Sequence, residues 1–363
     1  MYYLVLFLLI ICSYLEIIHK LKSKKPFVII YIVMTLMAMF RFGQVGDYFD
    51  YYYLFRLPAN LKDPLFTLYT LFFNFLGVKY TFYIAVTEII ILGLAFPFFY
   101  KTCQGSCISL FVFYTYTFLL CPMSALRQAI CLSLLLFSYR LLVEKKKIPF
   151  FIIVLIGMFI HLSFFSVFIL GLFYDKKIYN QKFIFYVVII ATLLFFSGLD
   201  IASGLRSSSS MENRSVSANI ENPFDIIIQI ILRLIIIIPV MLFKPKYGSD
   251  GYYAKAICVI GYIMYCLLAS NILVAGRIEF FYRTFLCLFI SYLSFTSTSK
   301  FRNAILYLFI CVHIVLFFKN INSFISQGDY YPNVTMFNFP YISIFDKSEI
   351  DEYSAIEQYN YNE

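Results

Sequence analysis

Long apolar runs separated by short charged segments are the dominant pattern along this chain. A run of about 20 mostly apolar residues is long enough to cross a lipid bilayer as a helix. Residues 64–76 form a short run that we expect to be a re-entrant or interfacial helix. The other expected helices lie at 1–18, 27–40, 79–100, 108–120, 122–143, 148–174, 183–199, 224–243, 256–275, 284–295 and 304–318. The pattern predicts an all-α, polytopic transmembrane helical bundle of about 11–12 spans, forming one integral membrane domain over residues 1–363.

Basic segments between the apolar runs indicate how the chain is oriented. Short loops rich in Lys and Arg stay on the cytoplasmic side of a membrane. The lysine-rich segments lie at 19–25, 144–147, 175–182 and 244–255. With these segments inside, we expect outer loops at 41–63 and 200–223 and an outer C-terminal tail at 320–363.

The run at 148–174 does not fit this orientation as one straight helix. A single span would place the basic segment 175–182 on the outer side. A turn near 157–163 lets two half-length pieces return the chain to the cytoplasm. Because discontinuous helices are where membrane proteins often build binding sites, we expect one broken or re-entrant helix here, with His161 at its turn.

The composition supports a membrane protein. The chain has 363 residues, of which 62% are hydrophobic and 13% charged, whereas soluble proteins carry about 25% charged residues. The net charge of +9 lies mostly in short loops, so it indicates topology rather than nucleic-acid binding. The apolar N-terminus lacks a basic leading region, and we expect a first span there rather than a cleaved signal peptide.

A few polar residues lie at costly positions next to or inside the apolar runs. Charged or titratable groups at membrane depth usually face a cavity, a partner or a substrate. The candidate site residues are Arg41, Asp47, Arg127, Gln128, His161, Arg277 and Arg283. In the expected topology the charged members share the outer side, where a helical bundle can bring them to one cavity.

Several arginines on one side suit an anionic ligand. Guanidinium groups match the oxygens of a phosphate with paired donors and stay charged when partly desolvated. Such a site can act on a sugar attached to a lipid pyrophosphate, because cations stabilise the departing diphosphate while a carboxylate or neutral His takes a proton. We expect no cofactor and no metal, since Asp47 and Asp50 are not the closely spaced carboxylate pair of a divalent-ion site.

Each of these residues also has a structural interpretation. Arg127 can extend toward lipid head groups, and His161 can hydrogen-bond between helices without a chemical role. Asp47 can cap a turn or pair with Arg41, and Arg277 can anchor the end of a helix.

Short motifs in order along the chain resemble a known family. They are the segment RFGQVGDYFDYYYLF at 41–55, the pair Arg127-Gln128 ahead of the basic turn 144–147, Ile-His-Leu-Ser at 160–163, and an arginine followed by aromatic residues at 277–282. Together they are similar to the EpsG-like group of Wzy-type polysaccharide polymerases.

This resemblance implies an O-antigen or capsular polysaccharide polymerase, a multi-pass glycosyltransferase of the bacterial cytoplasmic (inner) membrane. Such an enzyme transfers a glycan chain from undecaprenyl pyrophosphate onto a hydroxyl of a lipid-linked repeat unit at the periplasmic face, with inversion and without a metal. The implied partners are the undecaprenyl-pyrophosphate-linked oligosaccharide, membrane lipid and a chain-length regulator protein; we expect no nucleic acid.

The resemblance also implies roles for individual residues. The implied catalytic residues are His161, Asp47 and Arg127, with either His161 or Asp47 acting on the acceptor hydroxyl. The implied pyrophosphate-binding residues are Arg41, Arg127, Gln128, Arg277 and Arg283.

Two other classes of membrane protein remain open. A flippase or transporter for lipid-linked oligosaccharides also holds cations inside a bundle, but along a path that is open to both faces. A membrane polysaccharide O-acyltransferase also uses buried His and Arg, with an acyl donor from the cytoplasm. The gathering of charges on one expected face favours the polymerase.

Overall fold

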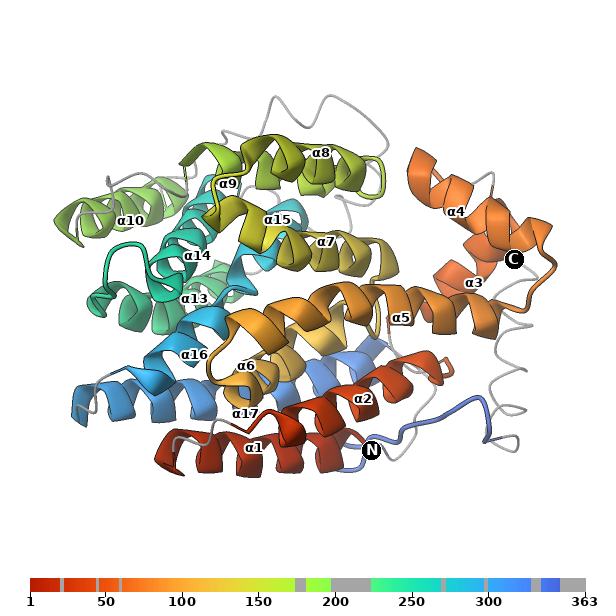
Figure 1. Ribbon diagram of the computed structural model, residues 1–363, viewed down its shortest axis with the longest axis horizontal. Helices are drawn as coiled ribbons and strands as arrows, with labels where there is room; N and C mark the ends of the chain where they lie inside the picture. The colour runs from red at the N-terminus through yellow and green to blue at the C-terminus, as the bar shows by residue number, and fades with distance from the viewer. Residues whose placement is uncertain are drawn as a thin grey trace. The chain divides into compact units, whose positions relative to one another are not determined.

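The computed structural model describes residues 1–19, 23–43, 46–58, 61–173, 181–196, 223–268, 272–296, 300–327 and 334–346. Within these residues the backbone forms helices, together with one isolated antiparallel bridge between Arg41 and Ser343 (Figure 1). The predicted all-α helical bundle is therefore confirmed. The expected basic loop at 175–182 lies mostly outside the described residues, as do residues 200–222 of an expected outer loop and 347–363 of the tail.

The helices gather into two compact units, Met1–Leu162 with Leu306–Glu363, and Ser163–Ile305. Unit 1 contains α1 (Tyr2–His19), α2 (Lys25–Met39), α3 (Tyr48–Arg56), α4 (Pro64–Phe75), α5 (Tyr80–Pro97), the π-helix η2 (Phe98–Thr102), α6 (Ser106–Val112), the π-helix η3 (Phe113–Phe118), α7 (Leu126–Val143), α8 (Lys147–Met158) and most of α17 (Lys300–Gln327). Unit 2 contains the 3-10 helix η4 (from Leu162 to Val167), α9 (Phe168–Phe173), α10 (Gln181–Phe196), α13 (Pro223–Leu242), α14 (Asp250–Leu267), α15 (Ile272–Arg283) and α16 (Leu286–Phe295).

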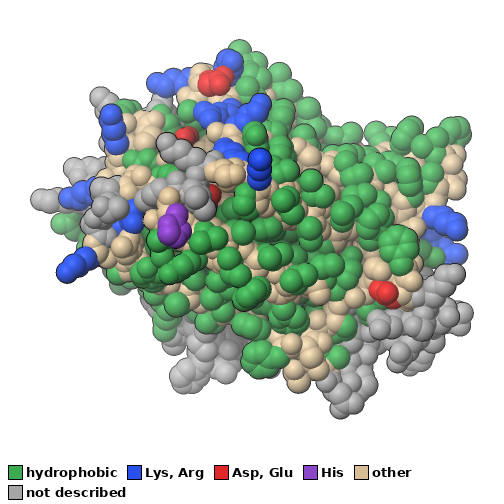
Figure 2. Space-filling view, turned by 60° about the horizontal axis from the view of Figure 1, so that its bottom comes forward, with side chains coloured by type: hydrophobic (Ala, Val, Ile, Leu, Met, Phe, Trp, Pro, Cys, Tyr) green, Lys and Arg blue, Asp and Glu red, His purple; other side chains and the backbone are tan. Residues whose placement is uncertain are grey.

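Many of these helices are apolar on the outside as well as the inside. In α1, Val5 and Leu9 are buried, while Leu4, Phe7 and Ile11 are exposed. A helix that is apolar all round belongs in a large core or a membrane. Figure 2 shows hydrophobic side chains dominating the visible surface, with Lys and Arg restricted to a few patches. The protein is therefore a multi-pass membrane protein.

Five of the described helical segments are long and apolar enough to cross a membrane. They are Tyr2–His19, Tyr80–Thr102, Leu126–Val143, Val274–Phe295 and Lys300–Ser326. Shorter apolar helices accompany them, including α2, α4 and α8. The number of spans and the side of the membrane that each loop faces remain predictions.

Unit 1 positions its polar residues by packing α1 against α6, α2 against α5, and α7 between α5 and α8. The short helices α3 and α4 lie together at one end of α5 (Figure 1). Contacts with α5 fix both helices there: the Tyr80 hydroxyl donates to the Tyr48 carbonyl of α3 at 2.9 Å, and the ring of Tyr69 in α4 lies 5.5 Å from that of Tyr83. The start of α7 lies beside this aromatic end through Tyr51.

The expected break in the run at 148–174 is present. Helix α8 ends at Met158, three residues turn without helical structure, and η4 continues from Leu162 to Val167. The amide of His161 donates to the Gly157 carbonyl at 2.9 Å, which closes the last turn of α8. His161 therefore lies at the turn of a discontinuous helix, as predicted.

Some helix boundaries differ from the expected ones. The segment expected as a loop at 41–63 contains α3, because Tyr48, Tyr51 and Phe55 form a buried stripe at helical spacing. Gly43 and Gly46 still form turns before it, with φ angles of 55° and 54°. Helix α7 begins at Leu126 rather than at residue 122, since residues 121–124 form a turn.

The last helix is longer than the expected span at 304–318. It continues to Gln327 because Phe317, Ile321 and Phe324 extend its buried stripe. Within the same stretch the side-chain amide of Asn320 donates to the Thr115 carbonyl in η3 at 3.0 Å. In a π-helix the backbone hydrogen bonds follow the i→i+5 pattern instead of i→i+4. The Asn320 amide gives the Thr115 carbonyl of η3 a hydrogen-bond partner.

A short segment near the C-terminus, residues 334–346, lies against the start of α1 and the end of α2. The Ile344 amide donates to the Phe40 carbonyl at 3.0 Å, and the Phe42 amide donates to the Ile342 carbonyl at 3.1 Å. The Tyr341 hydroxyl donates to the Met37 carbonyl at 2.8 Å. We call residues 334–346 the C-terminal strap.

Candidate functional site

Arg127 lies at the second position of α7 and contacts Tyr51 of α3 in two ways. Its backbone amide and its Nε each donate to the Tyr51 hydroxyl at 3.4 Å, and its Cζ lies 5.7 Å from the centre of the Tyr51 ring. The amides of the first helical turn have no partner inside the helix, so Tyr51 both caps α7 and orients the guanidinium. Burial raises the pKa of Tyr51, although the nearby Arg127 charge lowers it; the hydroxyl therefore stays protonated at neutral pH.

Asp63 forms an ion pair with Nη1 of Arg127. It precedes Pro64, the first residue of α4, a position from which an Asp side chain often caps the helix. Its carboxylate makes no such cap and reaches Arg127 instead. A carboxylate is also favoured beside the positive end of α7. Tyr51 and Asp63 thus hold the guanidinium from two sides.

The turn after α8, where the helix is broken, lies next to the residues around Arg127 and Asp63. The Leu65 amide at the start of α4 donates to the Phe159 carbonyl in the turn after α8 at 3.0 Å. One turn beyond Arg127 on α7, the Cys131 thiol donates to the Gly157 carbonyl at 3.3 Å. The start of α4, the start of α7 and the turn that carries His161 are therefore neighbours. His161 itself is half-buried.

Asp47 approaches this group from the loop before α3. A Cβ at Gly46 would lie 1.8 Å from Ser124 Oγ, so this loop contacts the turn that precedes α7 closely. Only glycine allows both this contact and the positive φ of Gly46. Asp47 follows it directly and is exposed, and its side chain makes no capping hydrogen bond to the first turn of α3.

Arg41 has a different environment. Its Nη1 donates to Glu88 Oε1 of α5 at 2.5 Å and to the Ala38 carbonyl at 3.1 Å. The two side chains are 2% and 0% exposed, and the backbone of Arg41 is bridged to Ser343 of the C-terminal strap. No ligand can touch the Arg41 guanidinium in this arrangement. Its expected role at a pyrophosphate remains a prediction.

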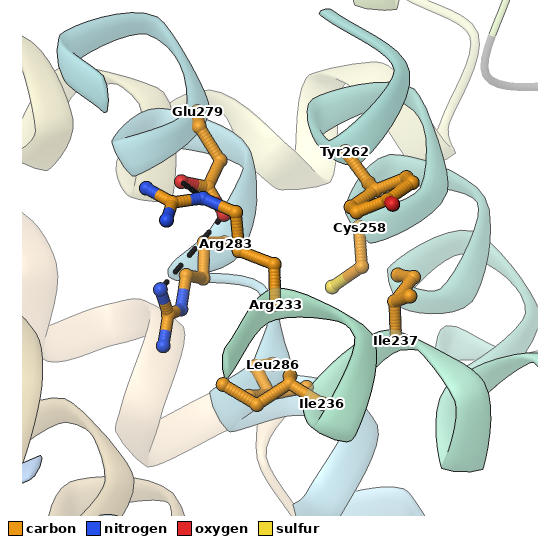
Figure 3. Close-up of a pocket in the computed structure, with 8 residues that line it drawn as sticks. All are labelled: Arg233, Ile236, Ile237, Cys258, Tyr262, Glu279, Arg283 and Leu286. Atoms are coloured by element: carbon orange, nitrogen blue, oxygen red, sulfur yellow. Dashed lines mark hydrogen bonds and ion pairs between the residues drawn. The ribbon is translucent and has the colours of Figure 1, made fainter. Parts of the chain in front are cut away.

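The remaining candidates have different surroundings. Gln128 is buried in α7 next to Arg127. Arg277 lies exposed within α15 rather than at a loop edge, since Val274–Phe295 forms one apolar stretch. Arg283, at the end of α15, lines a pocket of unit 2 with Arg233 and Glu279 (Figure 3).

The cluster of Arg127, Asp63, Tyr51, Asp47 and His161, which we call the Arg127 cluster, is partly open to ligands. The side chains of Arg127 and Asp63 are 27% and 17% exposed. Within the described part of the chain, Nη2 of Arg127 hydrogen-bonds to no protein group. A guanidinium that is fixed on one side and open on the other is suited to bind an anion.

The sequence pattern missed Asp63 and Tyr51 of the Arg127 cluster and Arg233 of the unit 2 pocket. Asp63 and Tyr51 have an ordinary explanation in the sequence, as a helix-capping residue and as one of several tyrosines. Arg233 lies within an apolar helix with no motif around it. A charged residue in an apolar run was the available signal for Arg233, whereas no local signal separates Tyr51 from the tyrosines beside it.

Comparisons with known proteins agree with the motif pattern. A search of curated proteins and a search of solved structures each found no match. A family model described as the EpsG family matches residues 24–343, a range that includes every helix of the Arg127 cluster. Because the match covers most of the chain, the protein belongs to the EpsG family, which is associated with Wzy-type polysaccharide polymerases.

Proposed function

We propose that this protein extends a surface polysaccharide by transferring a glycan chain from undecaprenyl pyrophosphate to a lipid-linked repeat unit on the extracytoplasmic side of the cytoplasmic membrane. Membership of the EpsG family supports a polysaccharide-polymerase-like function in general. The donor, the face of the membrane and the mechanism are our proposal.

In this proposal Arg127 binds the diphosphate of the donor. The open side of its guanidinium donates to phosphate oxygens, while Asp63 and Tyr51 hold the other side in place. Negative charge builds up on the diphosphate as its bond to the sugar breaks, so a cation already in position stabilises the transition state. Gln128, Arg277 and Arg283 are not needed for this step.

His161 acts as the general base in the proposed step. The acceptor hydroxyl oxygen forms a bond to the anomeric carbon while the bond from that carbon to the diphosphate oxygen breaks. The diphosphate leaves with the bonding electrons, and the hydroxyl proton moves to the imidazole of His161. Direct displacement inverts the anomeric centre. The exposed carboxylate of Asp47 is the alternative base.

One observation carries this proposal: the turn of the broken helix lies against the start of α4, beside the ion pair of Asp63 and Arg127. The bond from the Leu65 amide to the Phe159 carbonyl, at 3.0 Å, joins the two. The segments that carry His161 and Arg127, distant in the chain, are therefore neighbours, which supports the proposed pairing of a base with a phosphate-binding cation. An anchor for lipid head groups needs no such neighbour.

The test compares two arginines of the same helix. Arg127 begins α7, and Arg140 lies exposed in its last turn. In a strain that carries only the variant gene, Arg127→Ala should leave surface glycan as single repeat units, like a deletion, while Arg140→Ala should retain long chains. Both proteins must accumulate to the wild-type level in membranes.

The glycan pattern also separates the competing functions. Loss of a flippase would leave almost no surface glycan, and loss of an acyltransferase would leave long chains without acyl groups. Either pattern, or normal chain length in Arg127→Ala at normal protein level, would contradict the proposed polymerase. A product linkage that retains the configuration of the donor sugar would contradict direct displacement.

A further inference from the structure

Helix α3 has an exposed polar side, most of which the proposed transfer step does not use. Four exposed side chains follow one another there at a spacing of three residues: Asp47, Asp50, Tyr53 and Arg56. The Tyr53 side chain is 40% exposed. Because side chains three residues apart are neighbours on a helix, the four form a continuous row. We call these four residues the α3 row.

The exposed side of the neighbouring helix α4 is apolar by contrast. Leu68, Phe72 and Phe75 are all exposed there, a composition suited to contact with lipid. Helices α3 and α4 lie together at one end of α5 (Figure 1). Two carboxylates and a guanidinium on a helix side that contacts lipid would be costly. The α3 row therefore faces water, and Tyr53 does not serve as a membrane anchor.

Contacts on the other sides of α3 hold the row in place. The rings of Tyr52 and Tyr80 are 5.1 Å apart at an angle of 83°, and the Cζ of Arg56 lies 5.4 Å from the centre of the Tyr52 ring. The side-chain amide of Asn74 in α4 donates to the Phe55 carbonyl at 2.6 Å. A surface that is already ordered loses less entropy when it binds a ligand.

The α3 row continues from the Arg127 cluster. Asp47 belongs to both, and its carbonyl accepts from the Tyr51 amide at 3.0 Å. The Tyr51 hydroxyl in turn contacts Arg127. A helix rises 1.5 Å per residue, so the nine residues of α3 span about 14 Å. The row thus extends the cluster along a whole helix, next to the proposed diphosphate site.

The side chains of the row suit a sugar better than a phosphate or a hydrocarbon chain. Carboxylates accept hydrogen bonds from hydroxyl groups, and a guanidinium donates to hydroxyl oxygens. The face of a tyrosine ring is negative, so it attracts the weakly positive C–H groups of a pyranose ring. Asp47 and Asp50 repel a phosphate at this surface. Adjacent hydrogen-bonding groups around an exposed ring therefore favour a glycan.

We infer that the α3 row binds the glycan of the lipid-linked donor, while Arg127 binds the diphosphate of the same molecule. This inference rests on the proposed function and adds a subsite to it. Asp50 and Arg56 hydrogen-bond to sugar hydroxyls, and the Tyr53 ring packs against a sugar ring. The row acts on a part of the substrate that does not react.

The first test measures binding of a glycan without lipid or diphosphate. The probe is the single repeat-unit oligosaccharide, obtained by depolymerising the surface polysaccharide of the same strain. Saturation-transfer NMR measures its binding to the full-length protein in phosphatidylcholine nanodiscs. Tyr53→Ala should weaken binding about fivefold or more, because an aromatic contact is lost, while Arg127→Ala should bind as the wild type does. A wild-type protein that does not bind the probe would overturn the inference.

A matched tyrosine controls for effects on the membrane protein as a whole. Tyr14 of α1 is also exposed, among apolar neighbours, so Tyr14→Ala should leave binding unchanged. A loss equal to that of Tyr53→Ala would contradict the subsite.

Asp50→Asn covers the case in which Tyr53→Ala fails to fold. It keeps the shape of the side chain and removes a charged acceptor, so binding should weaken about threefold or more at an unchanged unfolding temperature. Wild-type binding in a folded Asp50→Asn protein would count against the subsite.

Kinetics distinguish the subsite from a merely structural role. With the intact lipid-linked donor, Tyr53→Ala should raise KM about fivefold and keep kcat within about twofold, since the lost contact is made equally before and during the reaction. A lipid diphosphate that carries one sugar, used as a competitive inhibitor, should keep its Ki. Equal rises in KM and Ki, or a fall in kcat alone, would show that Tyr53 supports the fold and does not bind glycan.

The outcomes also separate this inference from the proposed function. If the oligosaccharide binds through Tyr53 while Arg127→Ala still makes long surface glycan, the subsite stands and the role of Arg127 fails. If Arg127→Ala leaves single repeat units while no substitution in the α3 row changes binding, the role of Arg127 stands and the subsite fails.

Discussion

Two arginine–carboxylate pairs in unit 1 have the same chemistry and different access. The pair of Arg41 and Glu88 is 2% and 0% exposed, inside the packing of α2 and α5 and beside the C-terminal strap. The pair of Arg127 and Asp63 is 27% and 17% exposed, at the joint of α4, α7 and the turn after α8. The first pair is enclosed by protein, while the second is open on one side of its guanidinium.

This difference indicates what each arginine can do. An enclosed pair holds helices in register, and removing one partner leaves a buried charge. A pair that is partly exposed contributes little to stability but can exchange water for an anionic ligand. Both arginines lie at the edge of an apolar run in the sequence, so the sequence pattern treats them alike. The comparison predicts that substitutions at one should affect stability and at the other activity.

The largest expected effect on stability comes from breaking the enclosed pair. Arg41→Leu or Glu88→Leu alone should lower the free energy of unfolding by about 3–5 kcal/mol, because each leaves an unpaired charge in the interior. Denaturant unfolding of detergent-purified protein measures this. The double variant Arg41→Leu/Glu88→Leu should recover most of the loss. Single variants as stable as the wild type would show that the pair is not enclosed in solution.

The largest expected effect on activity comes from the open pair. Arg127→Ala should lower the rate of chain extension on synthetic lipid-linked repeat units by about 100-fold or more, as loss of a preorganised charge does elsewhere. Its free energy of unfolding should change by no more than about 1 kcal/mol. Arg127→Lys should recover part of the rate, since it keeps the charge but loses the paired donors. A large loss of stability would show that Arg127, like Arg41, has mainly a structural role.

Asp63 should act through Arg127 and is a positioning residue. Asp63→Asn should lower kcat by about tenfold, less than Arg127→Ala, because Tyr51 still orients the guanidinium. In the background of Arg127→Ala, adding Asp63→Asn should cost almost nothing further, since the two residues act as one unit. Additive losses in this double-variant cycle would give Asp63 a role of its own.

The smallest expected effect concerns the strap beside Arg41. Tyr341→Phe removes the hydroxyl that donates to the Met37 carbonyl at 2.8 Å, and should lower the free energy of unfolding by about 1 kcal/mol. Chain extension should keep its wild-type rate, because the strap contacts the enclosed pair and not the open one. A loss of activity without a loss of stability would instead connect the strap to the site.

The discontinuous helix and the position of His161 could be predicted because the basic segments that flank an apolar run are visible in the sequence. A long apolar run between two basic segments predicts a break in the helix, and His161 lies at the break between α8 and η4 in the structure. The sequence pattern also singled out Arg127, since an arginine at the edge of an apolar helix is costly. The neighbours of Arg127 were harder to find. Asp63 looks like an ordinary helix cap, and nothing local distinguishes Tyr51 from Tyr52 or Tyr53.

By itself, the sequence determined that this chain forms an apolar helical bundle of the EpsG family, because hydrophobic length and the order of short motifs are local properties. Only the tertiary structure decided which carboxylate each arginine meets. Glu88 is 47 residues from Arg41 in the chain and Asp63 is 64 residues from Arg127, and such pairings depend on how helices pack. Access to solvent, which separates a structural ion pair from a binding one, is set by that same packing.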